Sequence, residues 1–216
     1  LIFKITIFIF SFCLNANALE FKGKFQQGSF IIGKTSPKSQ VSVDNKKIRI
    51  SDGGFFAFGL DRDRKNDVTI KIKINDQTRT IVKKVLKRDY NIQRIDGLPK
   101  KQVTPPPEVY DKIKKDNILI SKARLINSNY DYFKDKFIYP IDKYIITGVY
   151  GSQRILNGKP RRPHYGIDFH APEGTPVKAM MAGEVTLVKK DMYFTGGTII
   201  FDHGHGVSTL YMHMKD

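Results

Sequence analysis

The sequence predicts a mostly β protein, and three observations support that prediction. Residues 20–98 consist of short runs in which apolar and polar residues mostly alternate, as they do in half-buried strands. Turn-forming residues, such as Val-Asp-Asn at 43–45 and Asp-Gly-Gly at 52–54, separate these runs. From residue 137 onward a glycine-rich loop is followed by further strand-like runs. The length of 216 residues suits two small domains, and 40% hydrophobic and 27% charged residues are typical of globular proteins.

The first segment, residues 1–18, has the pattern of a secretory signal peptide. One early cation, Lys4, precedes an apolar run at 5–12, and Ala-Asn-Ala at 16–18 is typical of a cleavage site. The apolar run is too short to span a bilayer as a finished helix. We therefore expect an exported protein of the periplasm or cell envelope. Cys13 is the only cysteine, so the mature chain would contain neither a disulfide nor a thiolate nucleophile.

The second segment, residues 19–98, is predicted to be a small β-sandwich-like module. Its clearest strand is VTIKIKI at 68–74, in which valine and the isoleucines lie on one face and threonine and the lysines on the other. The module contains no histidine and no constellation of catalytic residues. We expect it to have a structural role or to provide a docking surface.

The third segment, residues 99–136, is predicted to be a proline-rich linker followed by a helix. The three prolines at 105–107 should form an extended and stiff stretch. Residues 108–133 show weak helical periodicity, with apolar residues at positions 109, 113 and 120. The run NILI at 117–120 could also form a strand, and the sequence leaves both alternatives open.

The chain is strongly basic, with a formal net charge of +16. Such a charge attracts polyanions, for example nucleic acid, anionic lipid or an acidic cell-wall polymer. A solvated basic surface with no partner is the alternative. The sequence contains no arginine-rich tract and no nucleic-acid-binding motif, so we expect no nucleic-acid partner. Peripheral contact with a membrane stays open.

The fourth segment, residues 137–216, contains a histidine and an aspartate four positions apart, His164 and Asp168. In an extended strand these residues would lie about 13 Å apart, at ~3.3 Å per residue, which is too far to share one metal ion. If they bind one metal, the chain must bend between them, and Gly166 is the residue placed to allow that bend. An ordinary turn that leads into a strand is the alternative.

The remaining histidines lie close to this pair or further along the chain. His203 and His205 are two residues apart and form a candidate chelating pair, but the glycines around them favour a polar turn. His213 lies in a predicted strand of alternating pattern, where a hydrogen-bonded structural histidine is the common case. His170 lies in turn-forming sequence and has no obvious partner.

The ordered motifs of residues 137–216 resemble the zinc metallopeptidases of the lysostaphin and LytM type. The segments that carry the resemblance are HYGIDFH, GTPVKA, GEV, DHGHG and YMH, and they follow one another in the order typical of that family. The preceding run GVYGSQRILNGKPRRPH is similar to the loop that leads into the first ligand. The resemblance implies a mostly antiparallel β domain with the site in a groove across a sheet.

Position by position, the resemblance implies roles for three residues. His164 and Asp168 match the first two zinc ligands. His213 matches a catalytic histidine that stabilises the reaction centre without binding the metal, whereas the two histidines of DHGHG match a turn that does not bind it. The third ligand would lie beyond Asp216, so we expect the chain to be truncated, and inactive by itself.

The activity that the resemblance implies is zinc-dependent hydrolysis of peptide cross-links in bacterial peptidoglycan. The intact protein would then be a zinc metalloendopeptidase, with Zn²⁺ as its cofactor and peptidoglycan as its partner. One alternative is a non-catalytic LytM-like factor that binds peptidoglycan or activates a separate amidase. Another is a basic, polyanion-binding β protein that contains no metal.

Overall fold

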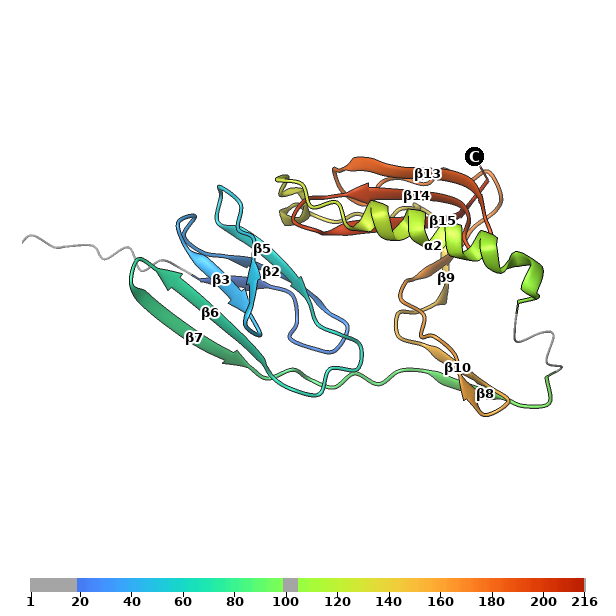
Figure 1. Ribbon diagram of the computed structural model, residues 1–216, viewed down its shortest axis with the longest axis horizontal. Coiled ribbons are helices and arrows are strands. Elements are labelled where there is room, and N and C mark those ends of the chain that lie inside the picture. Colours follow the sequence, from blue (N-terminus) through green and yellow to red (C-terminus); the bar gives the residue numbers. More distant parts are fainter. Residues whose placement is uncertain (1–18, 99–104, 216) are drawn as a thin grey trace, which may run out of the picture.

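The computed structural model of the protein describes residues 19–98 and 105–215. Strands dominate both ranges, so the predicted mostly β fold is confirmed (Figure 1). The predicted signal peptide, with Cys13, and residues 99–104 of the predicted linker lie outside the described residues. Within those residues, no helix has the length and apolar character needed to cross a membrane.

The N-terminal part of the chain is a sandwich of two antiparallel sheets. Its strands are β1 (Glu20–Lys22), β2 (Phe30–Lys34), β3 (Gln40–Val43), β4 (Lys46–Ile48), β5 (Phe55–Gly59), β6 (Val68–Ile74) and β7 (Gln77–Lys83). One sheet has the order β1–β2–β5, and the other has the order β4–β3–β6–β7. Each neighbouring pair is antiparallel. This part therefore has the sandwich-like fold that the sequence predicts.

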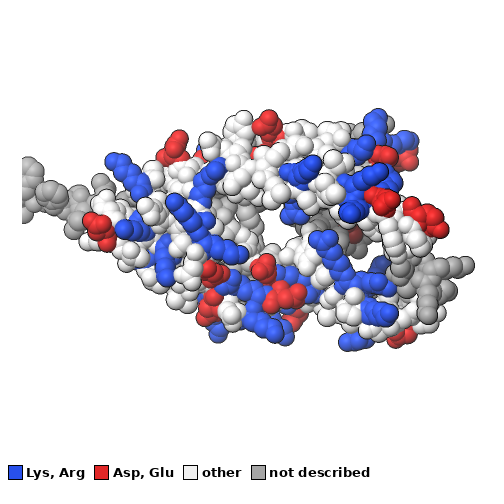
Figure 2. All heavy atoms as spheres, in the orientation of Figure 1, with Lys and Arg blue, Asp and Glu red and all other residues white. Residues whose placement is uncertain are grey.

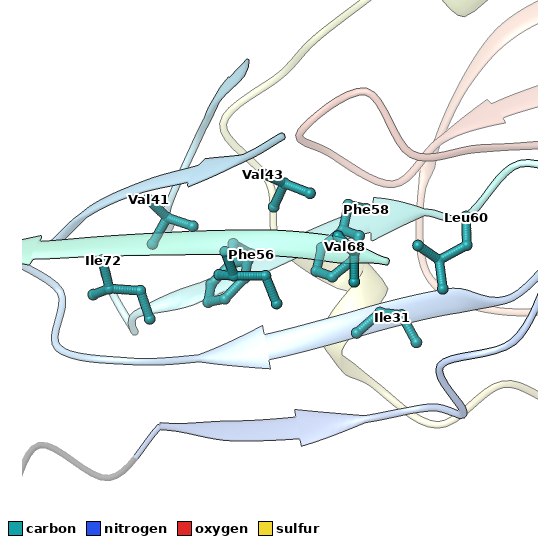
Figure 3. Close-up of a cluster of buried hydrophobic side chains, with 9 residues drawn as sticks. Ile31, Val41, Val43, Phe56, Phe58, Leu60, Val68 and Ile72 are labelled. Atoms are coloured by element: carbon teal, nitrogen blue, oxygen red, sulfur yellow. The ribbon is translucent and has the colours of Figure 1, made fainter. Parts of the chain in front are cut away.

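The core of the sandwich lies where apolar side chains from the two sheets meet (Figure 3). Phe56 of β5 and Ile70 of β6 are fully buried in it. The predicted alternation of β6 is confirmed, because Val68, Ile70 and Ile72 are buried while Lys71 and Lys73 are exposed. Gly33 of β2 lies against the Phe56 ring, and an added Cβ would be 2.1 Å from the ring's Cζ atom. Only a glycine allows this close approach of the two strands.

A tight turn joins β3 to β4 at Asp44 and Asn45. Both residues have positive φ, 49° and 64°, a conformation that Asp and Asn tolerate better than most residues. Arg64, from the segment between β5 and β6, places its Nη1 atom 2.6 Å from Asp44 Oδ2. The hydrogen bond from Arg64 holds the pKa of Asp44 below its usual value, although partial burial opposes the shift. Both partners of this ion pair, Arg64 and Asp44, therefore belong to the sandwich.

The described residues of the C-terminal part form small sheets and one α-helix. Its elements, with the strand that precedes them, are β8 (Ile92–Ile95), η1 (Pro107–Val109), α2 (Tyr110–Arg124), η2 (Tyr132–Lys134), β9 (Ile145–Gly148), β10 (Gln153–Leu156), β11 (Lys159–Pro160), β12 (Asp168–His170), β13 (Glu184–Met192), β14 (Gly196–Asp202) and β15 (Ser208–Met214). The sheets have the orders β13–β14–β15, β12–β9 and β11–β10–β8. The first two sheets are antiparallel, as the resemblance implies.

The helical interpretation of the linker is confirmed by α2, and the strand alternative for residues 117–120 is wrong. The helix lies along the sheet formed by β13, β14 and β15 (Figure 1) and contacts β13 and β14. A carboxylate, Asp116, is buried in this contact. Its Oδ2 atom accepts a hydrogen bond of 2.8 Å from the backbone N–H of Tyr193. This bond satisfies a polar group that would otherwise destabilise the contact.

The N- and C-terminal parts are joined by more than the linker. β8 follows directly from the sandwich, yet it pairs in parallel with β10, so that Ile92 lies opposite Gln153 (Figure 1). On the outer face of the β1–β2–β5 sheet, Ile32 and Ala57 are buried against Phe133, which is itself fully buried. The runs FIIGK and FFAFG are consequently apolar on both faces, since each face packs against other residues.

Candidate metal centre

His164 and Asp168 lie side by side in the structure. The Nε2 atom of His164 and the Oδ1 atom of Asp168 are 3.1 Å apart, so the chain bends between them as a shared site requires. The bend occurs at Gly166, but Gly166 does not have a positive φ. A Cβ added there would meet only His164 Nε2, at an ordinary distance of 3.7 Å. The predicted bend at Gly166 is therefore confirmed, although its φ and its surroundings would also accommodate a side chain.

Residues 149–152 hold His164 through main-chain hydrogen bonds. The N–H group of Gly151 donates to the His164 carbonyl at 2.7 Å, and the N–H group of His164 donates to the Ser152 carbonyl at 2.8 Å. The imidazole Nδ1 atom lies 3.3 Å from the Val149 carbonyl oxygen, to which it donates when it carries the ring proton. In that tautomer, Nε2 keeps a lone pair for a metal ion.

Asp168 is placed by the pairing of two short strands. It begins β12 and lies opposite Gly148, the last residue of β9. A Cβ added at Gly148 would be 2.1 Å from Asp168 Oδ2, so the missing side chain leaves the space that the carboxylate occupies. The side chains of His164 and Asp168 are 29% and 54% exposed, and both are therefore accessible from solvent.

The pair fits a zinc ion in chemistry and in spacing. Imidazole nitrogen and carboxylate oxygen both bind zinc at about 2.0–2.2 Å, and two such ligands of a tetrahedral ion lie roughly 3.3 Å apart. The measured separation of 3.1 Å is close to that value. The contact of Nδ1 with a backbone carbonyl is the arrangement that commonly orients a metal-binding histidine. Over residues 19–98 and 105–215, no third His, Cys, Asp or Glu joins the pair in one cluster.

His213 lies near the end of β15, exposed and with a positive φ of 59°. Its backbone N–H donates to the Thr195 carbonyl at 2.8 Å. Between Tyr211 and Met214 the pairing with β14 shifts by one residue, so the expected alternation of the strand breaks at His213. Among the described residues, no hydrogen bond or ion pair links its side chain to His164 or Asp168.

His203 has a structural environment in the turn between β14 and β15. It is fully buried. Its Nδ1 atom lies 2.7 Å from the Ala182 carbonyl oxygen, and its Nε2 atom lies 2.8 Å from the Thr209 hydroxyl oxygen. A neutral ring that donates from Nδ1 and accepts at Nε2 satisfies both contacts, which leaves neither nitrogen for a metal ion. This arrangement favours the turn interpretation over the chelating pair.

His205 belongs to the contact with the sandwich. Its ring centre is 5.2 Å from that of Phe133, and its backbone N–H donates to the Ser128 carbonyl at 3.1 Å. Arg49 of the sandwich donates to the same Ser128 carbonyl at 3.0 Å. Burial lowers the pKa of His205, and the nearby Arg49 guanidinium lowers it further. The neutral form of His205 is therefore favoured at this contact with the sandwich.

We expect the change His203→Ala to reduce the free energy of unfolding by about 2–4 kcal/mol, because it opens a cavity and leaves two buried polar partners unsatisfied. Urea denaturation followed by circular dichroism measures this effect, and calorimetry should show unchanged Zn²⁺ binding. The exposed His170→Ala is the matched control and should leave stability unchanged. Lost Zn²⁺ binding in a His203→Ala protein of normal stability would identify His203 as a ligand after all.

Sequence reasoning missed the residues that hold the pair in place. Gly148 provides space for the carboxylate, and residues 149–152 hold the histidine. The run GVYGS at 148–152 contains the pattern that could have identified this loop, because two glycines three residues apart favour close backbone packing. Their partners are distant in the sequence, however, and only the structure identifies them.

Residues 162–216 match the model of peptidase family M23. The matched residues include His164, Asp168 and His213, and the match confirms the predicted resemblance to the lysostaphin and LytM type for this part of the chain.

Two curated proteins and one solved structure illustrate the similarity. DD-carboxypeptidase/endopeptidase Mpg of Neisseria meningitidis is 44% identical over 55 residues, which are 25% of this chain and 12% of that protein. Peptidoglycan DD-endopeptidase ShyA of Vibrio cholerae is 33% identical over 79 residues, which are 36% of this chain and 18% of that protein. The matches thus span less than a fifth of either curated relative's length.

The similarity of fold extends over most of the chain. A crystal structure from Pseudomonas aeruginosa, assigned to peptidase M23, superimposes with a TM-score of 0.61. The alignment covers 88% of this chain and 74% of that chain. Because the two sequences are 19% identical, this likeness concerns the fold and not the activity.

Proposed function

We propose that the intact protein is a zinc-dependent endopeptidase that hydrolyses peptide cross-links in bacterial peptidoglycan. The observation that carries the proposal is the convergence of His164 and Asp168, 3.1 Å apart, within a segment that matches peptidase family M23. The activities named for the Neisseria and Vibrio relatives support the choice of substrate. The same names, together with the signal-like sequence at residues 1–18, support a location in the cell envelope.

In this proposal His164 and Asp168 hold the metal and His213 assists catalysis. Zinc, when bound, would activate a water molecule and polarise the amide carbonyl. A neutral imidazole and one carboxylate leave the site with a net positive charge, which favours that chemistry. An imidazole of His164 that donates from Nδ1 to the Val149 carbonyl would leave the Nε2 lone pair for the metal. His213 would donate a hydrogen bond to the developing oxyanion, a contribution of about 10²–10³ in rate.

The charge of the surface suits the proposed substrate. The chain carries a formal net charge of +16. Figure 2 shows lysine and arginine side chains spread over both halves of the visible face, with acidic side chains between them. A surface of this kind attracts a polymer rich in carboxylates without requiring one defined basic patch. We infer that electrostatic attraction keeps the protein close to its substrate.

The proposal is tested by incubating the purified intact protein with peptidoglycan sacculi and Zn²⁺. The expected result is the release of soluble fragments in which peptide cross-links are cleaved, as detected by liquid chromatography and mass spectrometry. A chelator should prevent the release, and added Zn²⁺ should restore it. A protein that binds Zn²⁺ and sediments with sacculi, but cleaves nothing, would instead favour the non-catalytic alternative. A protein that sediments without binding any metal would favour the polyanion-binding alternative.

A further inference from the structure

The loop that holds His164 is itself held by a residue of the N-terminal sandwich. Arg62 lies between β5 and β6 and is only 6% exposed. Its Nε atom donates a hydrogen bond of 2.8 Å to the Gly151 carbonyl, 89 residues further along the chain. A charged group as deeply buried as this guanidinium is held in one orientation by its hydrogen bonds.

The guanidinium of Arg62 is fixed by its other neighbours as well. Its central carbon lies over the ring of Tyr90, 4.3 Å from the ring centre. The hydroxyl of Tyr90 donates to the Arg62 carbonyl at 3.2 Å, which ties the two residues together. Nη1 pairs with Asp63 Oδ1 at 2.5 Å. Arg62 is therefore arranged within the sandwich to present Nε to the loop.

Gly151 receives this hydrogen bond in a tightly packed position. Its φ is +88°, a conformation that strongly favours glycine. A Cβ at this position would lie 2.0 Å from Cε1 of the Tyr90 ring. The Gly151 backbone is thus in contact with Tyr90 and hydrogen-bonded to Arg62, so the loop has little freedom to move relative to the sandwich.

A short chain of hydrogen bonds runs from Arg62 to the candidate ligand. Arg62 donates to the Gly151 carbonyl. The N–H group of Gly151 donates to the His164 carbonyl, and the N–H group of His164 donates to the Ser152 carbonyl. The Val149 carbonyl, in the same loop, contacts the imidazole Nδ1. Both the backbone and the ring of His164 are therefore oriented by the loop that Arg62 holds.

We propose that Arg62 is a positioning residue of the metal centre, acting through Gly151 to hold His164 Nε2 beside Asp168. This inference rests on the proposed function, since it requires His164 and Asp168 to bind a metal. According to this inference, the sandwich helps to hold the metal centre in shape and is more than a separate docking module. The physical reason is that a metal ligand binds best when its orientation is set before the ion arrives.

The test compares Arg62→Ala with Arg64→Ala, an arginine two residues away that makes an ion pair with Asp44 in the sandwich. Calorimetric titration with Zn²⁺ measures metal affinity. Hydrogen exchange of the Gly151 and His164 amides in the metal-free protein measures the order of the loop. For Arg62→Ala we expect a loss of about tenfold in Zn²⁺ affinity and faster exchange of both amides. Arg64→Ala should leave both quantities at their wild-type values, although it weakens the sandwich.

Equal affinity and equal exchange in Arg62→Ala and wild type would overturn the inference. So would equal losses in the two alanine variants, because they would reflect a general loss of sandwich stability. If Arg62→Ala does not fold, the comparison of Arg62→Lys with Arg64→Lys decides, since lysine keeps the charge but lacks the planar group that stacks on Tyr90. A wild-type protein that binds no Zn²⁺ would refute the proposed function, and amide exchange would still test whether Arg62 orders the loop.

Discussion

Replacing His164 with alanine is expected to abolish specific Zn²⁺ binding, with a loss of affinity of more than about 100-fold. The reason is that the loss of a group which merely orients a ligand already costs about 10–100-fold, and this change removes the imidazole itself. Asp168→Asn should have a comparable effect, because it keeps the shape of the side chain but removes the negative charge that stabilises a divalent cation. Isothermal titration calorimetry with Zn²⁺ measures both losses.

Two matched variants control for non-specific effects of these changes. His170→Ala removes an exposed histidine at the other end of β12. Asp142→Asn removes an exposed carboxylate that accepts hydrogen bonds from Lys178. Both should bind Zn²⁺ like the wild type. Wild-type affinity in His164→Ala or Asp168→Asn would contradict the assignment of the metal centre to this pair.

Replacing Phe56 with alanine is expected to reduce the free energy of unfolding by about 3–5 kcal/mol. Phe56 is fully buried, and its ring lies 6.2 Å from the ring of Phe21 and 6.4 Å from that of Phe58. The cavity left by the change lies between two sheets. Hydrogen bonds between neighbouring strands hold each sheet in shape, so the surrounding residues cannot readily move in to fill the cavity. Urea denaturation followed by circular dichroism gives the measurement.

Phe194→Ala is the control for the Phe56 substitution. Phe194 is 59% exposed, and its loss should change the free energy of unfolding by less than about 0.5 kcal/mol. Similar losses in the two variants would show that the sandwich core does not dominate the stability of the chain. The expected contrast follows from burial alone, since both substitutions remove the same side chain.

Some elements of the fold could be predicted because their pattern is local. The alternation of residues 68–74 predicted one buried face, which the structure confirms. Strands β2 and β5 could not be understood in the same way, because Phe133 covers the face of their sheet that lies away from the sandwich core. Periodicity reveals which side chains one element buries, but it contains no information about a second partner that is distant in the sequence.

In the candidate site too, some features could be predicted from the sequence and others are revealed only by the structure. The spacing of His164 and Asp168 is a local property, so a bent chain could be anticipated from the motif. The bend itself does not need Gly166, whereas Gly148 and Gly151 pack too closely against Asp168 and Tyr90 to carry a side chain. Close approach of two segments is decided by tertiary packing, and a glycine in a sequence does not indicate which neighbour it accommodates.

The sequence by itself determined the mostly β fold, since alternation is a pattern of neighbouring residues, and it identified His164 and Asp168 as a candidate metal-binding pair. Only the tertiary structure decided that Arg62 of the sandwich reaches Gly151 and thereby the loop around His164. Arg62 and Gly151 are 89 positions apart, so their hydrogen bond forms only because the fold brings donor and acceptor together. The conformational preferences of neighbouring residues contain no information about such a long-range contact.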